Sequence, residues 1–464
     1  MRYSLPALPT ELVENVASHM EAKKDLLALR LVCTELCSKT TDVFTKAFYH
    51  TIETSLSLTS LYRLHHIAKH EYLRDKVKEL HFVAKGRIVR GNLREQVRYK
   101  NKLILSPTFG VGYEWREGGR REGGTGKFRW NCVAIRELRD LLTRSFTNCR
   151  SFRIGKDGTD WALLDEYRKN CITSFDVLAI LLHIVGLTGM QVKSFTVESR
   201  LWASELATAN PASHYDPAFW DFGRFQEGWN FLQSLDLDMM EHDLDPGMTS
   251  PDESAKQNAR IVCAAKSLKR LRLAFTDHDG QSMLLQEISS GGFTPPLEIL
   301  VLKSTEFSAD AITCFLPRVA RSLKTIVFHE LGLHGRWESV FSLLQCRSRF
   351  SSLNDITMAS LCHRVVQSNM NRYAERLWLS FQYFRHNRLL PAPLENEKFE
   401  LLDMPWSSSW PISGGLQGIR YKGPNMSVAF DLLNEKVEFI DYYRAGETEQ
   451  GVLEKDFQIN EWRW

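Results

Sequence analysis

One apolar pattern returns eight times along this chain and limits what it can fold into. Each unit has an apolar residue, two others, an apolar residue, one other, and a third apolar residue. The units are Val77-Leu80-Phe82, Cys149-Phe152-Ile154, Val192-Phe195-Val197, Leu232-Leu235-Leu237, Leu268-Leu271-Leu273, Leu297-Leu300-Leu302, Leu323-Ile326-Phe328 and Leu353-Ile356-Met358. The last two positions alternate as buried side chains do in a strand, and the first anchors the turn before it. The pattern therefore predicts eight short strands in series.

The segments between these units have helical spacing of apolar residues. The clearest are residues 135–146, 175–187, 254–265, 309–320 and 337–344. Strands that alternate with helices indicate an α/β fold. Successive units begin 72, 43, 40, 36, 29, 26 and 30 residues apart. Strand–helix repeats of about 20–29 residues fit the last intervals, and insertions explain the longer ones. A conventional α/β domain with this spacing is the alternative.

Residues 51–370 resemble an irregular leucine-rich-repeat solenoid. Repeats of that family usually place Asn or Cys three residues after the last strand position. That position here holds Lys85, Asp157, Arg200, Met240, Thr276, Thr305, Leu331 and Leu361. The ladder of side chains that characterises the family is therefore absent from this sequence.

A short helical region precedes the repeats, and we expect three helices within residues 8–49. Thr10 is expected to cap the first, whose apolar stripe is Leu12, Val16 and Met20. Asp25 is expected to cap the second, and Asp42 lies near the start of the third. Three short helices cannot enclose an adequate core alone. They need the rest of the chain, a partner, or both.

The first 50 residues resemble an F-box, the motif that docks on the small adaptor subunit of a cullin–RING ubiquitin ligase. The resemblance is carried by Leu8-Pro9, Glu11-Leu12, Val16, Asp25-Leu26, Leu29-Arg30 and Val32-Cys33. It implies that Leu8, Pro9, Leu12, Val16, Leu26, Leu29, Val32 and Cys33 hold the motif together or face the adaptor. Many family members have Trp three residues after the Cys, whereas this chain has Leu36. An ordinary helical cap on a larger domain is the alternative.

Composition excludes several classes of protein. The 464 residues are 43% hydrophobic and 25% charged, as in ordinary globular proteins, and the net charge of +3 argues against a nucleic-acid binder. The longest apolar run, residues 175–187, is too short to cross a bilayer, and no signal peptide is evident. The 9 cysteines are scattered, which favours a reducing compartment, cytoplasmic or nuclear.

Two regions interrupt or follow the repeats. Residues 85–130 are rich in Arg and Gly and are expected to project as a mobile loop. A solvated insertion is the preferred interpretation, and a receptor for an acidic or phosphorylated peptide is the alternative. Residues 371–464 are expected to form a mixed α+β cap, with 371–384 as a helix or final strand and strands at 419–421, 428–430, 437–439 and 457–459. A separate recognition domain is the alternative.

The sequence contains no convincing catalytic, metal or cofactor site. Gly123-Gly124-Thr125-Gly126-Lys127 lacks the first Gly and the final Ser or Thr of a phosphate-binding loop. His66 and His70, with His65 adjacent, have no placed third ligand. Asp277-His278-Asp279 follows an expected strand but has no identifiable nucleophile. Six aromatic residues, Phe219, Trp220, Phe222, Phe225, Trp229 and Phe231, suit core packing better than base stacking.

These observations favour an α/β protein with an F-box at 1–50, a leucine-rich-repeat-like region at 51–370 and a cap at 371–464. The resemblance implies a non-catalytic substrate receptor of an SCF-type ligase, with the adaptor and cullin as partners and no nucleic acid or membrane. Outward strand positions are the candidate substrate surface, with Arg153, Asp236 and Arg272 as contacts, although the Arg residues are alternatively solvated or paired with Asp236. A scaffolding protein that recruits no substrate is the main alternative. A hydrolase or transferase would need a convergent polar pocket.

Overall fold

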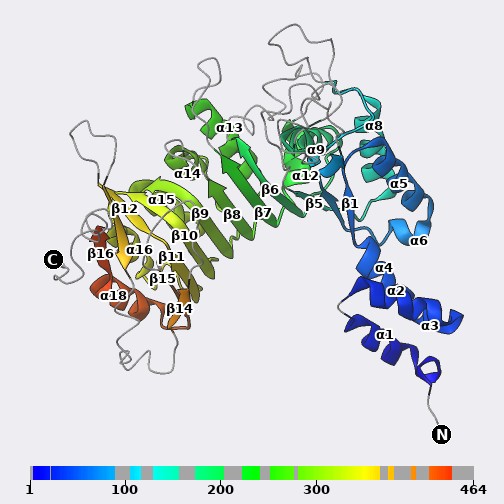
Figure 1. Cartoon of the computed structure of the whole chain (residues 1–464). Coiled ribbons are helices and arrows are strands. Elements are labelled where there is room, and N and C mark those ends of the chain that lie inside the picture. The colour runs from blue at the N-terminus through cyan, green and yellow to red at the C-terminus, as the bar shows by residue number, and fades with distance from the viewer. Residues whose placement is uncertain are drawn as a thin grey trace, which may run out of the picture. The chain divides into compact units, whose positions relative to one another are not determined.

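The computed structural model describes residues 4–20, 22–88, 105–115, 129–155, 172, 174–202, 222–240, 251–275, 281–365, 375–380, 399–403 and 417–441. The chain divides into two compact units. Unit 1 contains residues 1–199 and 219–228, and unit 2 contains residues 200–218 and 229–464. The fold is mixed α/β with mostly parallel strands, and a helical region at the N-terminus, as expected (Figure 1).

Unit 1 begins with helices and continues as a parallel sheet. The first elements are the 3₁₀ turn η1 (Leu5–Ala7), α1 (Thr10–Ser18), α2 (Lys23–Val32), α3 (Thr34–Lys39) and α4 (Thr41–Tyr49). They are followed by β1 (Thr51–Thr54), α5 (Leu58–Lys69), α6 (Glu71–Arg74), β2 (Glu79–Phe82), β3 (Lys85–Ile88), β4 (Leu105–Thr108), α8 (Val133–Asp140), the π-helical turn η2 (Leu141–Ser145), β5 (Ser151–Ile154), α9 (Ser174–Thr188), β6 (Ser194–Trp202) and α12 (Phe222–Trp229). Strands β1, β2, β5 and β6 pair in that order, all parallel.

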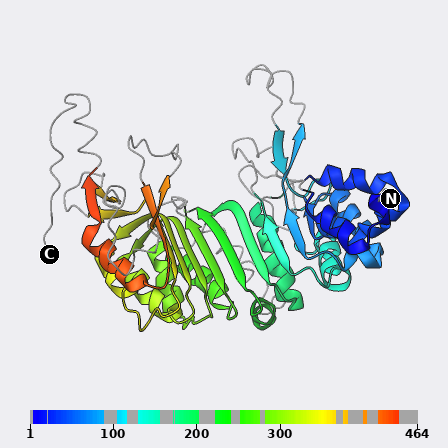
Figure 2. The same ribbon diagram turned by 90° about the horizontal axis from the view of Figure 1, so that it is seen from below.

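Unit 2 alternates strands and helices and ends in antiparallel strands. Its elements are β7 (Ser234–Met240), α13 (Pro251–Cys263), β8 (Arg270–Phe275), α14 (Gln281–Ser290), β9 (Ile299–Ser308), α15 (Ala309–Val319), β10 (Thr325–His334), α16 (Trp337–Leu344), β11 (Asp355–Ala359), β12 (Cys362–Val365), β13 (Glu375–Ser380), β14 (Phe399–Asp403), β15 (Gln417–Lys422), α18 (Met426–Lys436) and β16 (Glu438–Asp441). Strands β7 to β11 are parallel neighbours (Figure 2), and β15 and then β14 continue antiparallel beyond β11.

All eight strands expected from the apolar pattern are present, as β2 and β5 to β11. Every one of the pattern's apolar residues is buried, with Leu353 the most accessible at 4%. The strands pair in the register that aligns the pattern. In unit 2, for example, Leu271 lies opposite Leu300, and Leu300 lies opposite Ile326. Since each strand brings the same apolar positions to the same face, neighbouring strands within each unit build a continuous core.

A backbone ladder joins the turns that precede the strands. The carbonyl before one strand accepts N–H groups from two successive residues before and at the start of the next strand. Lys269 and Arg270 N–H both donate to the Gln233 carbonyl at 2.9 Å, and Lys324 and Thr325 N–H donate to the Glu298 carbonyl at 2.8 and 3.0 Å. The same arrangement occurs at the carbonyls of His50, Lys78, Arg150, Lys269 and Lys324. Main-chain groups thus make regular cross-repeat bonds, although the sequence has no ladder of Asn side chains.

The five expected helices between the repeats are present as α8 with η2, α9, α13, α15 and α16. At the N-terminus the expectation of three helices was wrong, because the expected second helix is divided at Cys33 into α2 and α3. The backbone of Cys33 is extended, with φ −160° and ψ 163°, so this residue ends α2 and caps α3. Two expected caps were also wrong. Pro9 precedes α1, so Thr10 is its first residue, and Asp25 lies inside α2.

The C-terminal region contains both confirmed and incorrect expectations. Residues 419–421 lie in β15, 437–439 overlap β16, and 371–384 contain the strand β13. The strand expected at 428–430 was wrong, because these residues belong to α18. Met426, Ala429, Phe430 and Leu433 are buried at helical spacing, and the Phe430 ring lies 6.3 Å from that of Phe341 on α16. The strand expected at 457–459 lies outside the described residues.

The described parts of the basic insertion are ordered, whereas a projecting loop was expected for the whole segment. Strands β3 and β4 form an antiparallel pair. Trp115 is buried, and its indole N–H donates to the Gly110 carbonyl at 2.7 Å. Residues 89–104 and 116–128, with the Gly-rich run, lie outside the described residues. Within the part of the chain that the structure describes, no helix is both long and apolar enough to span a membrane.

Candidate functional site

The N-terminal helices carry a disproportionate share of the exposed apolar surface. Among the described residues, ten large hydrophobic side chains are exposed, and five of them lie between positions 12 and 32. These five are Leu12 and Val16 on α1, and Leu27, Leu31 and Val32 on α2. Leu31 is 86% exposed and Val32 69%. Such a concentration of exposed apolar side chains is typical of an interaction site.

The eight residues implied by the F-box resemblance divide between core and surface. Leu26 and Leu29 are buried in a small core with Val13, Ala17 and Leu36, and Leu8 and Cys33 are half-buried against it. Pro9, Leu12, Val16 and Val32 are exposed. The stripe expected on α1 is thus divided: Leu12 and Val16 are exposed, whereas Met20 follows the helix and packs partly buried against the core. The core face of α1 is Val13 and Ala17.

Sequence reasoning missed Leu27 and Leu31. They are four residues apart on α2 and are both exposed, while Leu26 and Leu29 on the same helix are buried. The sequence did contain a signal for these two residues, because the apolar residues of α2 lie on more than one face of the helix. A helix of a small module that is apolar on two faces has one face for its own core and one left over.

The Leu-Pro start is held onto α3 by one lysine. Lys39 donates from Nζ to the Pro6 carbonyl at 2.7 Å and to the Leu8 carbonyl at 2.8 Å. Its ammonium also forms an ion pair with Glu35 at 2.7 Å. These bonds fix the chain just before α1, and so define the position at which that helix begins.

Arg30 performs a similar role between α2 and α4. Its guanidinium lies over the Phe44 ring, 4.2 Å from the ring centre, and donates to the Cys37 carbonyl at 2.8 Å and to Thr40 Oγ1 at 3.2 Å. A planar cation that stacks and bonds in this way orients both helices. Arg30 thus stabilises the module through contacts in which the exposed apolar side chains of α2 take no part.

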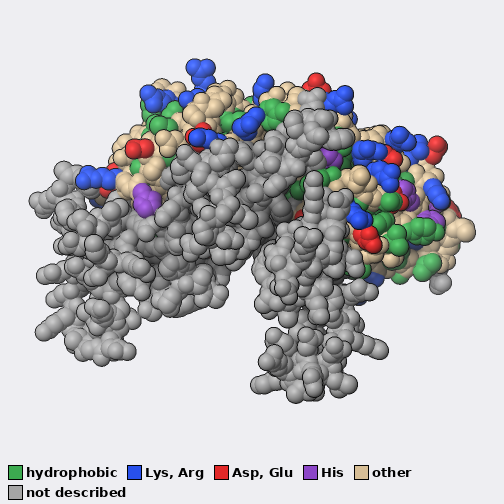
Figure 3. All heavy atoms as spheres, turned by 90° about the horizontal axis from the view of Figure 1, so that it is seen from above, with side chains coloured by type: hydrophobic (Ala, Val, Ile, Leu, Met, Phe, Trp, Pro, Cys, Tyr) green, Lys and Arg blue, Asp and Glu red, His purple; other side chains and the backbone are tan. Residues whose placement is uncertain are grey.

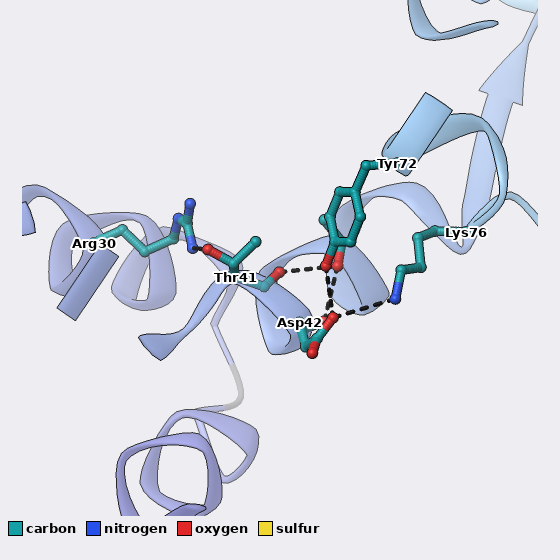
Figure 4. A network of polar contacts seen from close by, with 6 residues as sticks. Arg30, Thr41, Asp42, Tyr72 and Lys76 are labelled. Carbon is teal, nitrogen blue, oxygen red and sulfur yellow. Dashed lines mark hydrogen bonds and ion pairs between the residues drawn. The ribbon is translucent and has the colours of Figure 1, made fainter. Parts of the chain in front are cut away.

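A polar network joins α4 to α6 and the turn after it (Figure 4). Asp42 accepts a hydrogen bond from the Tyr72 hydroxyl at 2.6 Å and from Lys76 Nζ at 3.2 Å. The bond from Tyr72, and then those with Lys76, lower the pKa of Asp42, while Asp42 raises the pKa of Lys76. The Lys76 ammonium also lies 4.8 Å from the Tyr72 ring centre.

The connection from α4 to the sheet is a single residue. His50 follows the last residue of α4 and precedes the first of β1. Its carbonyl accepts from Lys78 and Glu79 N–H, both at 3.0 Å. Helix α4 is therefore held at its C-terminal end by the backbone of β2 and near its N-terminal end by Asp42. The helical module is therefore attached to the sheet region of unit 1 at both ends of α4.

The structure places the candidate substrate contacts in ion pairs on their sheets. In unit 1, Arg153 Nε lies 3.4 Å from Glu79 and 3.8 Å from Glu198, on the two neighbouring strands. In unit 2, Arg272 pairs with Asp236 at 2.5 Å across β7 and β8. The alternative that an Arg pairs with Asp236 therefore holds for Arg272.

The outward positions of unit 2 form a row in register. Asp236, Arg272, Val301, Val327 and Thr357 are opposite one another on β7 to β11. Beyond them, Arg420 makes a two-pronged bond with Asp355 at 3.1 and 2.8 Å. Figure 3 shows one face of the molecule, on which basic and acidic side chains of the described residues both occur.

Among the described residues, the other sequence motifs form no recognisable metal-binding or catalytic group. No group of three His, Cys, Asp or Glu residues suited to a metal occurs in the described residues. His66 contacts the Tyr62 ring edge-on at 4.5 Å. Phe225 and Trp229 are buried, as expected for core packing, but the expectation was wrong for Phe231, which is 50% exposed. Phe219 and Trp220 lie outside the described residues. Residues 277–279 and the Gly-rich run at 123–127 lie outside the described residues.

Two comparisons with known proteins were negative: no protein-family model matches the chain, and no curated protein matches it.

Proposed function

We propose that this chain is an F-box-type substrate receptor, whose N-terminal helices dock on the adaptor of a cullin–RING ubiquitin ligase. The observation that carries the proposal is the cluster of exposed Leu and Val side chains on α1 and α2. Burying one Leu side chain stabilises an interface by about 1.5–3 kcal/mol. Five large apolar side chains held in water by a module of fewer than 50 residues are best explained by a partner that covers them.

In this function the chain performs no bond chemistry. A receptor brings a substrate lysine close to the charged conjugating enzyme, which raises its effective concentration. Such a device needs a defined distance between docking and reading surfaces. The single-residue connection at His50 and the Asp42 network support it, because they hold the helical module against the sheet of unit 1.

The test is binding of the full-length chain to the purified adaptor by calorimetry. Leu12→Asp and Leu31→Lys each place a charge in the exposed apolar group. Each suits its helix, since Leu12 lies in the first turn of α1 and Leu31 in the last turn of α2. Both should weaken binding at least about tenfold, because burying an unpaired charge is costly. Leu58→Asp is the matched control. Leu58 is 56% exposed and begins α5, where an acidic residue is tolerated.

The proposal fails if the wild-type chain does not bind the adaptor, or if both charged variants bind as tightly as Leu58→Asp. Circular dichroism melting of the three variants provides the folding control. Equal melting temperatures with unequal binding separate a docking role from a structural one.

We propose further that substrate is read by the outward strand positions, including Arg153, Asp236 and Arg272. The Asp236 carboxylate of this pair is only 17% exposed, so removing Arg272 alone would change its surroundings as well as the surface. The informative variant therefore combines Asp236→Asn with Arg272→Gln, which removes both charges of the pair together. Proteins that co-purify with the wild type and are lost with this variant or with Arg153→Gln are substrate candidates. Retention of all of them by both variants contradicts this surface.

A scaffolding role is the second candidate, and it is supported by the same exposed group, which requires only a binding partner. The two functions differ in the fate of the bound proteins. If the chain is a receptor, depleting it should raise the abundance of co-purifying proteins, and adding proteasome inhibitor should remove the difference. Unchanged abundance favours the scaffold.

A further inference from the structure

The turns before the strands present a row of side chains whose charges differ between the two units. The residues of this row directly precede the strands and take part in the backbone ladder through a carbonyl or an N–H group. In unit 1 three successive members, just before β2, β5 and β6, are Lys78, Arg150 and Lys193. The bonds from Arg150 N–H to the Lys78 carbonyl, 3.2 Å, and from Lys193 N–H to the Arg150 carbonyl, 2.7 Å, place them in register. Adjacent strands lie about 4.8 Å apart, so these cations are close neighbours.

No carboxylate among the described residues pairs with these three cations. The Arg150 guanidinium donates to the neutral side chain of Gln191, at 2.6 Å. The acidic residues that flank Lys78 in the sequence are paired with arginines outside the row. Asp75 lies 3.7 Å from Arg74, and Glu79 lies 3.4 Å from Arg153. Like charges directly opposite one another on neighbouring strands are destabilising. The unit 1 row therefore presents three like charges side by side, and no carboxylate of the described residues neutralises them.

In the corresponding row of unit 2 basic and acidic residues alternate, as expected where side chains pair with one another within the fold. Glu298 stands between two lysines, 3.8 Å from Lys269 and 2.8 Å from Lys324. The hydrogen bond from Lys324, together with the charge of both lysines, lowers the pKa of Glu298. The repeat architecture thus permits an acidic residue at this position and uses one in unit 2.

We infer that Lys78, Arg150 and Lys193 form a docking site for an acidic segment of a partner protein. This inference is independent of the proposed function, since it uses neither the exposed apolar group of α1 and α2 nor the outward strand positions. Charge complementarity identifies the partner's chemistry: alternate Asp or Glu side chains of an extended acidic segment point to the same side and can each approach one cation. Three cations are few for a membrane surface, where stable binding needs a larger basic cluster. The net charge of +3 also argues against nucleic acid.

The test measures binding of the full-length chain to a fluorescent poly-L-glutamate at low and at physiological salt. The test variant combines Lys78→Gln, Arg150→Gln and Lys193→Gln. The matched control combines Lys269→Gln and Lys324→Gln in the row of unit 2, where the two lysines share the Glu298 carboxylate. Exposed ion pairs are individually weak, so the triple variant should lose about tenfold in affinity and the control less than about twofold. Binding by the wild type should weaken as salt rises, because the charges are exposed.

Two further probes decide the class of partner. They are vesicles that contain phosphatidylserine and a single-stranded oligodeoxythymidylate. The inference is overturned if the triple variant binds poly-L-glutamate as the wild type does, or if the control loses as much. It is also overturned if vesicles or the oligonucleotide depend on the row while poly-L-glutamate does not. Thermal melting checks folding, and the single variant Lys193→Glu, which should also weaken poly-L-glutamate binding, replaces the triple variant if that variant does not fold.

Discussion

The N-terminal helices and the strand repeats use the same kinds of apolar side chain with opposite results. In the repeats, every apolar residue of the eightfold pattern is buried, because the next strand always supplies its neighbour. In the described residues of the segment 5–49, the buried apolar core has five members, and five large apolar side chains are exposed to water. In a repeating sheet, neighbouring strands bury one another's apolar residues. A small helical module has an apolar face that its own core does not cover. The difference separates the apolar residues that build a core from those that are left for the proposed partner.

The largest expected effect is in the centre of the repeat core. Leu300 on β9 lies between Leu271 and Ile326 and is fully buried. Leu300→Ala should lower the free energy of unfolding by about 3–5 kcal/mol, through lost burial and the cavity left behind. Leu31→Ala, at an 86% exposed position, should change it by less than about 0.5 kcal/mol. Urea unfolding measures both, and similar effects would remove the contrast between the two regions.

A buried histidine gives the repeat region a pH dependence. Burial, and secondarily the charge of Arg139, lowers the pKa of His183 on α9 from 6.5 to about 4. The unfolded chain therefore binds this proton more tightly, so stability is complete above pH 6.5 and declines as the pH falls toward 4. The shift corresponds to at most about 3 kcal/mol. His183→Leu should flatten stability against pH in this window, as measured by thermal melting, and an unchanged slope would contradict the assignment.

Neighbouring residues of α2 sharpen the comparison within a single helix. Leu26 is 3% exposed and Leu27 is 42% exposed. Leu26→Ala should cost about 2–3 kcal/mol, at the lower end for leucine because the core is small and able to collapse. Leu27→Ala should cost less than about 0.5 kcal/mol but reduce adaptor binding. Hydrogen exchange of α2 amides reports the first effect, and equal losses in both variants would show that the two faces are not distinct.

The smallest expected effect is at the junction between the regions. Removing the Tyr72 hydroxyl by Tyr72→Phe should raise the pKa of Asp42 toward its ordinary value of 3.8, and Lys76→Met should raise it less. Because the pKa of Asp42 is lowered in the folded chain, its contribution is present above pH 3.8 and is lost as the pH falls through that lowered value. The groups are exposed, so the effect on stability is small. Carboxyl titration by NMR measures the shift, and no change in either variant would show that the network does not form.

Sequence alone determined the strands, because their apolar pattern has a period of two and each unit repeats it. It also determined the helices of the repeats, and α16 has the expected bounds of 337–344. The strand expected at 428–430 failed for a related reason. A short run of Val, Ala and Phe fits both periods, and contact with α16 selected the helix.

Only the tertiary structure decided which apolar residues of the N-terminal helices face inward. The sequence placed Leu12 and Leu26 in one group, and the structure separates them, with one in water and one in the core. Pairing between distant charges was decided in the same way. Arg272 and Asp236 are 36 residues apart, Arg420 and Asp355 are 65 apart, and strand register alone brings them together. Local periodicity specifies elements, while the direction of a side chain and its distant partner depend on how the elements pack.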